Sequence, residues 1–271
     1  MKIIRRKKDL KKIVNVKNIS LIPTMGGLHK GHEFLIKKAI KKKTTTIVSI
    51  FVNPKQFNSR KDFLTYPRNF KKDINILKRL RVDYLYIPNF KDIFSFKTKN
   101  LIHLNPFYKR LCGKFRPGHF KGVLNIVNRL LELIKPKYIY LGQKDFQQLL
   151  LIKKHIYKNH IRSTIVSCKT IRLKNKLPYS SRNLNLSNES LYLGSKIIKL
   201  IEQEKKIIKR NKLIDINLNN LKKNIKNLGV KKIDYIEAIN LNNLKKAKKY
   251  NEKFNIFSAF YLEKVRIIDN I

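Results

Sequence analysis

Two histidines stand three residues apart in the stretch PTMGGLHKGH, which covers residues 23–32. His29 and His32 follow a glycine pair and precede apolar residues that recur at helical spacing. From the first turn of a helix, side chains three apart can point into one crevice. Two imidazole N–H groups held there could stabilise the negative charge that grows on a phosphate during transfer. The pattern therefore predicts a site for phosphate chemistry.

The same residues allow other interpretations. A histidine pair at the start of a helix could serve only to cap that helix, and a zinc site would need a third ligand and supporting acids that are not apparent nearby. The glycines and the helix start also favour an anion, through free backbone N–H groups and the helix dipole. The GxGxxG and Walker patterns are absent, so a nucleotide would be bound in another way.

Strand-like and helix-like segments alternate along the first two thirds of the chain. Strands are expected at 18–25, 44–53, 82–88, 138–142 and 163–172, and helices at 32–43, 70–80, 122–136 and 147–159. This alternation predicts an α/β fold, a Rossmann-like, doubly wound parallel sheet. The segments PTMGG, FVNPKQF and LGQKD each follow a strand directly. Because ligands bind outside the carboxyl ends of such strands, one crevice could collect all three.

The pattern changes beyond the segment SSRN. Two basic helices, at 188–211 and 213–227, precede short strands at 232–240, 254–262 and 265–271. They predict a smaller C-terminal α+β domain, and we place the two domains at 1–174 and 175–271. No internal repeat and no linker rich in Gly, Ser or Pro is evident.

The chain is strongly basic: 63 Lys and Arg against 17 Asp and Glu give a formal net charge of +46. A nucleic-acid-binding protein should concentrate this charge on a stripe or tail with interleaved aromatic residues. Here the lysines are spread evenly, and Lys, Asn and Ile, which share A/T-rich codons, are used heavily together. Compositional drift explains this better than a specific nucleic-acid partner. A basic nucleic-acid-binding protein without catalysis stays open as an alternative.

Other bulk features predict a cytoplasmic protein. Cys112 and Cys168 form neither a disulfide framework nor a metal-binding spacing. No run approaches the roughly 18 apolar residues of a membrane span. The basic N-terminus lacks the apolar core of a signal peptide.

Seven segments together carry a family resemblance. They are IPTMGGLHKGH, SIFVNPKQF, YPRNFKKD, RPGHFKGV, LGQKDFQQL, SSRN and RIIDNI. Their order and spacing resemble those of the pantoate–β-alanine ligases (pantothenate synthetases), a family of the HxGH nucleotidyltransferase superfamily. The resemblance runs from about Ile22 to Ile271 and is strongest between Pro23 and Asn183. Each motif alone is weak, but seven in register are specific.

The resemblance implies an activity. The expected enzyme is an AMP-forming ligase that joins (R)-pantoate and β-alanine through a pantoyl adenylate and releases pyrophosphate, AMP and pantothenate. ATP is a substrate, Mg²⁺ should bridge its phosphates, and protein ligands of the metal are unknown. The family also implies a homodimer whose partners are small molecules, without a membrane partner. Adenylation of another acid is the alternative within this chemistry.

The resemblance also assigns site residues. The expected catalytic residues are His32, His29, Lys144 and Arg182. The expected ATP-binding residues are Met25, Gly26, Gly27, Leu28, His29, Lys30, Gly31, His32, Gly142, Gln143, Lys144, Asp145, Ile171, Tyr179, Ser180, Ser181 and Arg182. The expected pantoate and β-alanine residues are Gln56, Gln148, Asn53 and Arg116. Without their neighbours, the glutamines would be ordinary surface amides and the serines a helix cap.

Four residues depart from the family pattern. Lys30 stands where the family has an acidic residue, and Gln143 where it has Glu; both changes make the nucleotide end more positive. Tyr179 replaces Met or Leu and could reshape the adenine pocket, and Cys112 replaces Glu. The changes at Lys30 and Gln143 bear on affinity more than on activity.

Overall fold

The computed structural model describes residues 1–14, 18–104 and 106–271. The chain divides into two compact units, Met1–Ile171 and Arg172–Ile271, and each is described here by itself. The division falls slightly before the boundary expected between residues 174 and 175. In the described residues, no helix is long and apolar enough to cross a membrane.

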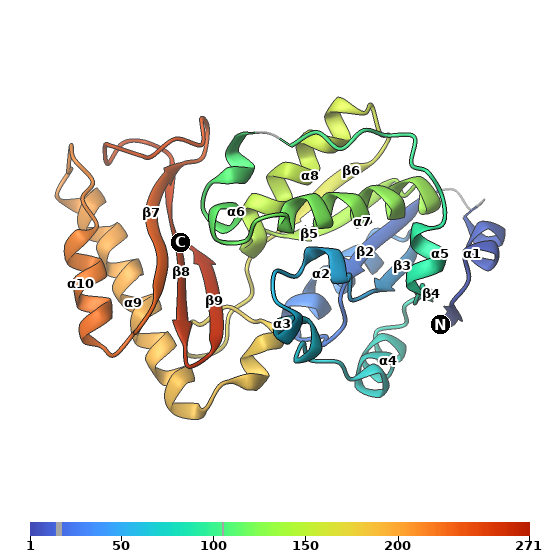
Figure 1. Cartoon of the computed structure of the whole chain (residues 1–271), viewed down its shortest axis with the longest axis horizontal. Helices are drawn as coiled ribbons and strands as arrows, with labels where there is room; N and C mark the ends of the chain where they lie inside the picture. The colour runs from blue at the N-terminus through green and yellow to red at the C-terminus, as the bar shows by residue number, and fades with distance from the viewer. Residues whose placement is uncertain (15–17, 105) are drawn as a thin grey trace. The chain divides into compact units, whose positions relative to one another are not determined.

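The first unit is built on a parallel sheet (Figure 1). In the described part of the chain it has six strands in the order β1-β4-β3-β2-β5-β6. The strands are β1 (Lys2–Ile4), β2 (Ile19–Thr24), β3 (Thr45–Ile50), β4 (Tyr84–Tyr86), β5 (Tyr138–Gly142) and β6 (Thr164–Cys168). The chain runs outward from β2 on one side and from β5 on the other, so the strand order reverses between these two neighbours. The carboxyl edge at such a reversal is where α/β sheets bind ligands.

Helices cover this sheet because both of its faces are apolar. The described helices are α1 (Lys7–Ile13), α2 (Lys30–Ile40), α3 (Arg60–Leu64), α4 (Phe70–Arg79), α5 (Phe90–Phe94), α6 (Cys112–Phe115), α7 (His119–Ile134) and α8 (Phe146–Lys158), with 3₁₀ turns η1 (Pro54–Gln56), η2 (Pro106–Lys109) and η3 (Gln143–Asp145). On β2, Leu21 and the next residue, Ile22, are both fully buried, although they point to opposite faces. Burial on both faces is the pattern of a parallel sheet between helices. Helix α2 packs against β2, β3 and β5, whereas α7 packs on β2 and beside α8.

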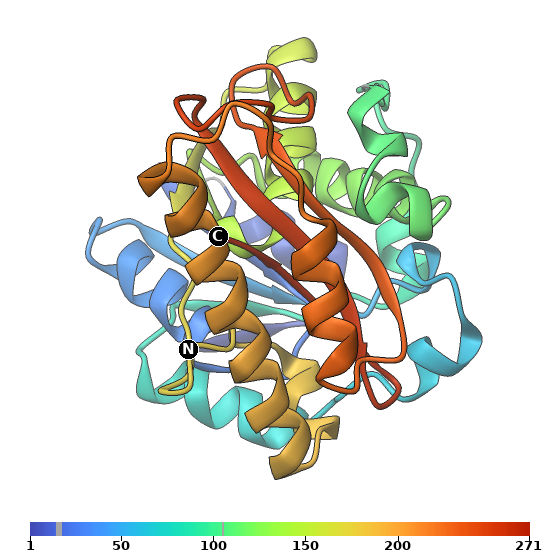
Figure 2. The same ribbon diagram turned by 90° about the vertical axis from the view of Figure 1, so that its left-hand side faces the viewer.

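The second unit has a three-stranded antiparallel sheet among its described residues, in the order β7-β8-β9. Its elements are η4 (Ser181–Asn185), α9 (Asn188–Arg210), α10 (Asn219–Asn227), β7 (Ile233–Asn240), β8 (Phe254–Leu262) and β9 (Val265–Asn270). Figure 2 shows α9 and α10 lying side by side over one face of this sheet. Their apolar residues form one core with the strands, in which Ile198, Ile201 and Phe260 are fully buried.

The parallel sheet and the small α+β unit confirm the expected fold class. Several details were wrong. β1 and α1 were not expected, because a three-residue edge strand carries too little pattern. The expected strand 163–172 ends at Cys168, and the expected helix 213–227 begins only at Asn219. Residues 213–216 instead pair with another segment: the Ile216 N–H donates to the Lys248 carbonyl at 3.1 Å, and the Tyr250 N–H to the Leu213 carbonyl at 2.9 Å.

Candidate active site

The two histidines cap helix α2 through one nitrogen each. His29 is the N-cap residue, and its Nδ1 accepts a hydrogen bond from the Gly31 N–H at 3.1 Å. The His32 Nδ1 accepts a longer one, 3.4 Å, from the His29 N–H. The ring centroids lie 4.1 Å apart. The imidazoles thus form the reciprocal cap that Ser and Glu make in other helices.

Burial keeps both rings neutral, and the cap sets which ring nitrogen carries the proton. Burial, with smaller contributions from His32 and Lys144, lowers the pKa of His29 from its ordinary 6.5 to about 2. Burial and the Lys144 charge lower the pKa of His32 to about 4. Both rings are therefore neutral at pH 7. A neutral imidazole that accepts at Nδ1 carries its proton on Nε2, so the Nε2 of each ring is an N–H group. The histidines can therefore cap the helix through Nδ1 and still act in phosphate chemistry through Nε2–H, so the two interpretations of this motif are compatible.

The loop before the histidines is held by side chains on both of its flanks. The Thr24 Oγ1 donates to the Ser49 carbonyl at 2.8 Å and accepts from the Gly26 N–H at 3.2 Å. The Asp73 carboxylate accepts from the N–H groups of Gly27 and Leu28, at 2.9 and 2.7 Å. The sequence analysis expected an anion to be favoured by free N–H groups at the helix start. The N–H groups of Gly26, Gly27 and Leu28, which precede that start, donate to protein side chains instead.

Gln56 lies at the end of η1, directly after β3. Asn53 caps this turn: its Oδ1 accepts from the Lys55 N–H at 3.2 Å. The fully buried Asn53 amide donates to the Gly122 carbonyl at 3.0 Å and to the Gln56 Oε1 at 3.3 Å. The Gln56 Nε2 lies 2.8 Å from the Met25 Sδ, so the expected pantoate segment meets the histidine loop. Asn53 therefore orients the Gln56 side chain.

Arg116 and His119 act on the Gln56 backbone. The His119 Nδ1 lies 2.8 Å from the Gln56 carbonyl, and the Arg116 guanidinium lies 3.1 Å from the His119 Nε2 and 3.3 Å from the same carbonyl. Arg116 can only donate, so His119 accepts at Nε2 and donates from Nδ1. The residues of RPGHF thus hold the glutamine turn in place.

The segment after β5 brings a cation to the histidines. Gly142 ends the strand, and η3 carries Gln143, Lys144 and Asp145 into α8. Lys144 is half-buried and close enough to depress the pKa of both imidazoles. Gln148 is half-buried in the first turn of α8.

The sequence did not reveal a role for Gln147, which precedes Gln148. It is buried, and its Nε2 donates to the carbonyls of Phe107 and Arg110 at 2.7 and 2.8 Å. It therefore fixes the segment around η2. In the sequence only the adjacent pair of glutamines pointed to this region, and the pair does not indicate that Gln147 is buried and Gln148 half-buried.

The serine–arginine segment belongs to the second unit. Ser180 caps η4, accepting from the Arg182 N–H at 3.3 Å; Ser181 is buried, and Tyr179 and Arg182 are half-buried. Arg172, just before this segment, forms a two-pronged ion pair with the buried Asp269 at 2.6 and 3.0 Å. The terminal RIIDNI motif thus anchors the start of the unit.

Comparison with known proteins decides the family. The pantoate-beta-alanine ligase family profile matches residues 2–271. The chain belongs to the pantoate–β-alanine ligase family. A pantothenate synthetase of Francisella tularensis subsp. novicida is 41% identical over 262 residues, which cover 95% of this chain and 90% of the relative.

Solved structures of the family agree. The pantoate-β-alanine ligase of Francisella tularensis, complexed with "Beta-gamma ATP and Beta-alanine", is 41% identical with a TM-score of 0.85, covering 100% of this chain and 97% of that one. Pantothenate synthetase from Thermus thermophilus is 26% identical with a TM-score of 0.93, covering 100% and 99%.

Against this family background, the first unit brings together three of its expected segments. The histidine loop contacts Gln56 through Met25, and Lys144 acts on both imidazoles. Among the described residues, no three side chains of His, Cys, Asp or Glu lie together in a way that could hold a metal ion. Asp73 was overlooked, although it lies inside the quoted segment YPRNFKKD.

Proposed function

We propose that this chain ligates (R)-pantoate to β-alanine at the expense of ATP. In the first step a pantoate carboxylate oxygen bonds to the α-phosphorus, the α–β phosphoanhydride breaks, and pyrophosphate leaves. In the second step the neutral amine of β-alanine attacks the acyl carbon of the adenylate. The bond to AMP breaks, the nitrogen loses its proton, and pantothenate forms.

The neutral histidine pair is the observation that carries this proposal. Because Nδ1 is occupied in the helix cap, His29 and His32 present Nε2–H donors whose orientation the backbone fixes. Such donors need no reorganisation when charge develops on the phosphates. Lys144 adds a full positive charge next to them. Ser180, Ser181 and Arg182 are proposed from the family resemblance to bind phosphate as well.

The polar groups of η1 suit the other substrate. The Gln56 amide can both donate and accept, as the hydroxyls and carboxylate of pantoate require. Asn53 donates to the Gln56 side chain and Arg116 to its backbone carbonyl, so we propose that both orient Gln56 toward pantoate. We propose that Gln148 binds pantoate as well. A site built on such hydrogen bonds rejects analogues that lack the hydroxyls.

The remaining expectations follow the resemblance. Mg²⁺ enters with ATP as part of the substrate, because it keeps water ligands and phosphate oxygens in preference to a protein cage. We further propose a cytoplasmic homodimer.

The test combines product analysis with two variants. The purified protein, given ATP, Mg²⁺, pantoate and β-alanine, should yield AMP and pantothenate in equal amounts by chromatography. His32→Ala should lower adenylate formation about 100- to 1,000-fold. His32→Asn, which keeps a side-chain acceptor for the cap, should fold as well as the parent and stay impaired.

Three other results of this test would each contradict part of the proposal. Near-normal turnover by folded His32→Ala would refute the role of the imidazole. AMP formation with a different acid, but not with pantoate, would establish the alternative substrate. RNA binding with no AMP from any acid would establish the nucleic-acid alternative.

A further inference from the structure

Asp73, on helix α4, is a buried carboxylate that meets the backbone of the histidine loop. Only 2% of its surface is exposed. Each oxygen accepts one N–H: Oδ2 from Gly27 at 2.9 Å and Oδ1 from Leu28 at 2.7 Å. These donors immediately precede His29, the N-cap of α2.

The loop is shaped around this carboxylate. Gly26 and Gly27 have φ angles of +80° and +61°, a conformation that residues with a Cβ rarely adopt. A Cβ added at Gly26 would come within 3.0 Å of the Asp73 Oδ2. The glycine at 26 thus serves both the left-handed turn and the close approach of the carboxylate.

Helix α4 also supports α2 and the loop at other points. Leu28 packs in one buried cluster with Ile76 and Leu77 of α4. Farther along, Arg79 lies 3.3 Å from the nearly buried Glu33 of α2. Asp73 is therefore one of several contacts by which α4 supports α2 and the loop that precedes it.

A carboxylate is a costly choice for this position. Burial raises the pKa of Asp73, while the hydrogen bonds from Leu28 and Gly27 act in the opposite direction. A buried charge is tolerated when hydrogen bonds satisfy it, and here each of the two N–H groups donates to a different oxygen of Asp73. A carboxylate supplies both, and an amide supplies one.

We propose that Asp73 is a positioning residue for His29 and His32. By fixing the backbone of Gly27 and Leu28, it sets where α2 begins and keeps both imidazoles in the reciprocal cap that leaves Nε2 protonated. This inference rests on the proposed function only for its catalytic consequence, since the effect on the cap is independent of the reaction.

The test is Asp73→Asn in the full-length protein. Its amide retains one acceptor but turns an NH₂ group toward the second N–H. Adenylate formation should fall about 100-fold, as expected for a small displacement of catalytic groups. The ¹⁵N spectra of His29 and His32, which report the Nε2–H tautomer in the parent, should become mixtures of both tautomers.

Asp83→Asn is the matched control. The Asp83 Oδ2 also accepts a backbone N–H, that of Thr46 at 2.8 Å, but near the start of β3, at the opposite edge of the sheet. This variant should keep the parent's turnover and imidazole spectra. If Asp73→Asn fails to fold, Asp73→Glu, which keeps both oxygens but displaces them by a methylene, carries the same measurements.

The outcomes separate this inference from the proposed function. Unchanged tautomers in folded Asp73→Asn would overturn the positioning role, whether or not turnover falls. Mixed tautomers with unchanged turnover would overturn its catalytic consequence. A parent protein that forms no AMP and no pantothenate would refute the proposed function, while the spectra would still decide whether Asp73 sets the cap.

Discussion

At the scale of single residues, the histidines serve structure and chemistry at once. Each ring gives Nδ1 to the start of α2 and retains Nε2 as a donor. A similar arrangement occurs farther along α8 in His155, whose Nε2 lies 3.0 Å from the Asn128 Oδ1 and whose Nδ1 lies 3.2 Å from the Asn159 Nδ2. Burial lowers its pKa to about 4 as well.

These imidazoles predict a specific pH dependence. Unfolded histidines titrate near 6.5, whereas folded His32 and His155 should titrate near 4. As pH falls from 6.5 toward 4, the unfolded chain takes up protons that the folded rings refuse, so the folded state loses stability. Thermal unfolding followed across this range should show a falling midpoint.

An NMR titration assigns the effect to residues. Bound ATP, a polyanion, should raise the pKa of His29 and His32 because it stabilises the imidazolium form. His155 should be unaffected and serves as the internal control. A midpoint near 6.5 for His32 in the free protein would contradict this account.

At the scale of elements, the contact between η1 and α7 places the glutamine turn. The helix approaches the turn at Gly122, where an added Cβ would lie 2.3 Å from the Lys55 carbonyl oxygen and 2.8 Å from the Gln56 Cα. The first turn of α7 also supplies His119, which contacts the Gln56 carbonyl. A glycine here lets two backbones meet, and the polar contacts then fix their register.

Gly122→Ala tests this contact. The methyl group must push η1 away from α7, so we expect a loss of about 1 to 3 kcal/mol in the free energy of unfolding. Displacement of Gln56 should raise the KM for pantoate about tenfold or more and change the KM for ATP much less, because a loss of about 1.4 kcal/mol of binding is tenfold. Urea unfolding and steady-state kinetics measure the two effects.

Lys121→Ala, the exposed neighbour on α7, is the control and should change neither quantity. An equal rise of both KM values in Gly122→Ala would mean that the whole site had collapsed.

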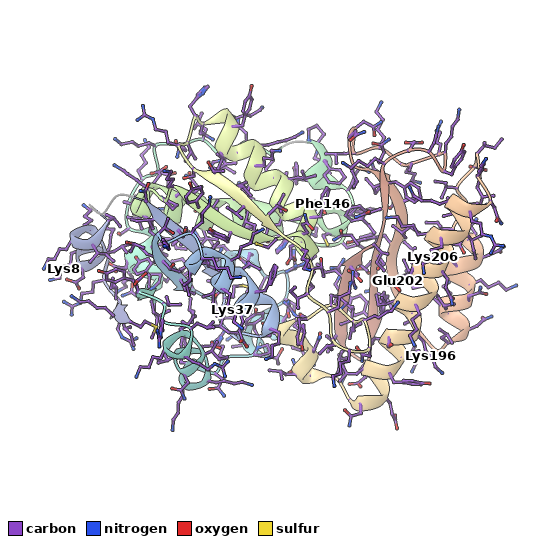
Figure 3. The ribbon with its side chains drawn as sticks, turned by 180° about the vertical axis from the view of Figure 1, so that it is seen from behind. Lys8, Lys37, Phe146, Lys196, Glu202 and Lys206 are labelled. Carbon is purple, nitrogen blue, oxygen red and sulfur yellow. The ribbon has the colours of Figure 1, made fainter. Side chains whose placement is uncertain are left out.

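At the scale of the molecule, the positive charge is a general property of the surface. Figure 3 labels Lys8, Lys37, Lys196 and Lys206, which come from helices α1, α2 and α9 and are exposed. Charge spread over several helices raises the potential around the protein, whereas a nucleic-acid-binding protein concentrates it on one stripe or tail. It also destabilises the folded state through repulsion.

The net charge of +46 therefore predicts a response to salt. At about 0.5 M NaCl, exposed charges are screened over only a few ångströms, so the unfolding midpoint should rise and retention of RNA on a filter should disappear. Retention that survives this salt and prefers one RNA sequence would favour the nucleic-acid alternative.

The sequence by itself determined the fold class and the family, and through the family it named the candidate site residues apart from Asp73 and Gln147. Hydrophobic periodicity is local, and motifs such as HKGH, NPKQF and SSRN are contiguous, so both can be read along the chain. It also located the two histidines at a helix start.

Only the tertiary structure decided what those residues do to one another. The Asp73 carboxylate meets Gly27 and Leu28 across more than forty positions of chain, and Gly122 meets Gln56 across more than sixty. The choice of tautomer in the histidine cap likewise depends on hydrogen bonds with fixed directions. Such long-range contacts leave no periodic signal, because they depend on packing of whole elements and on where each buried donor finds its acceptor.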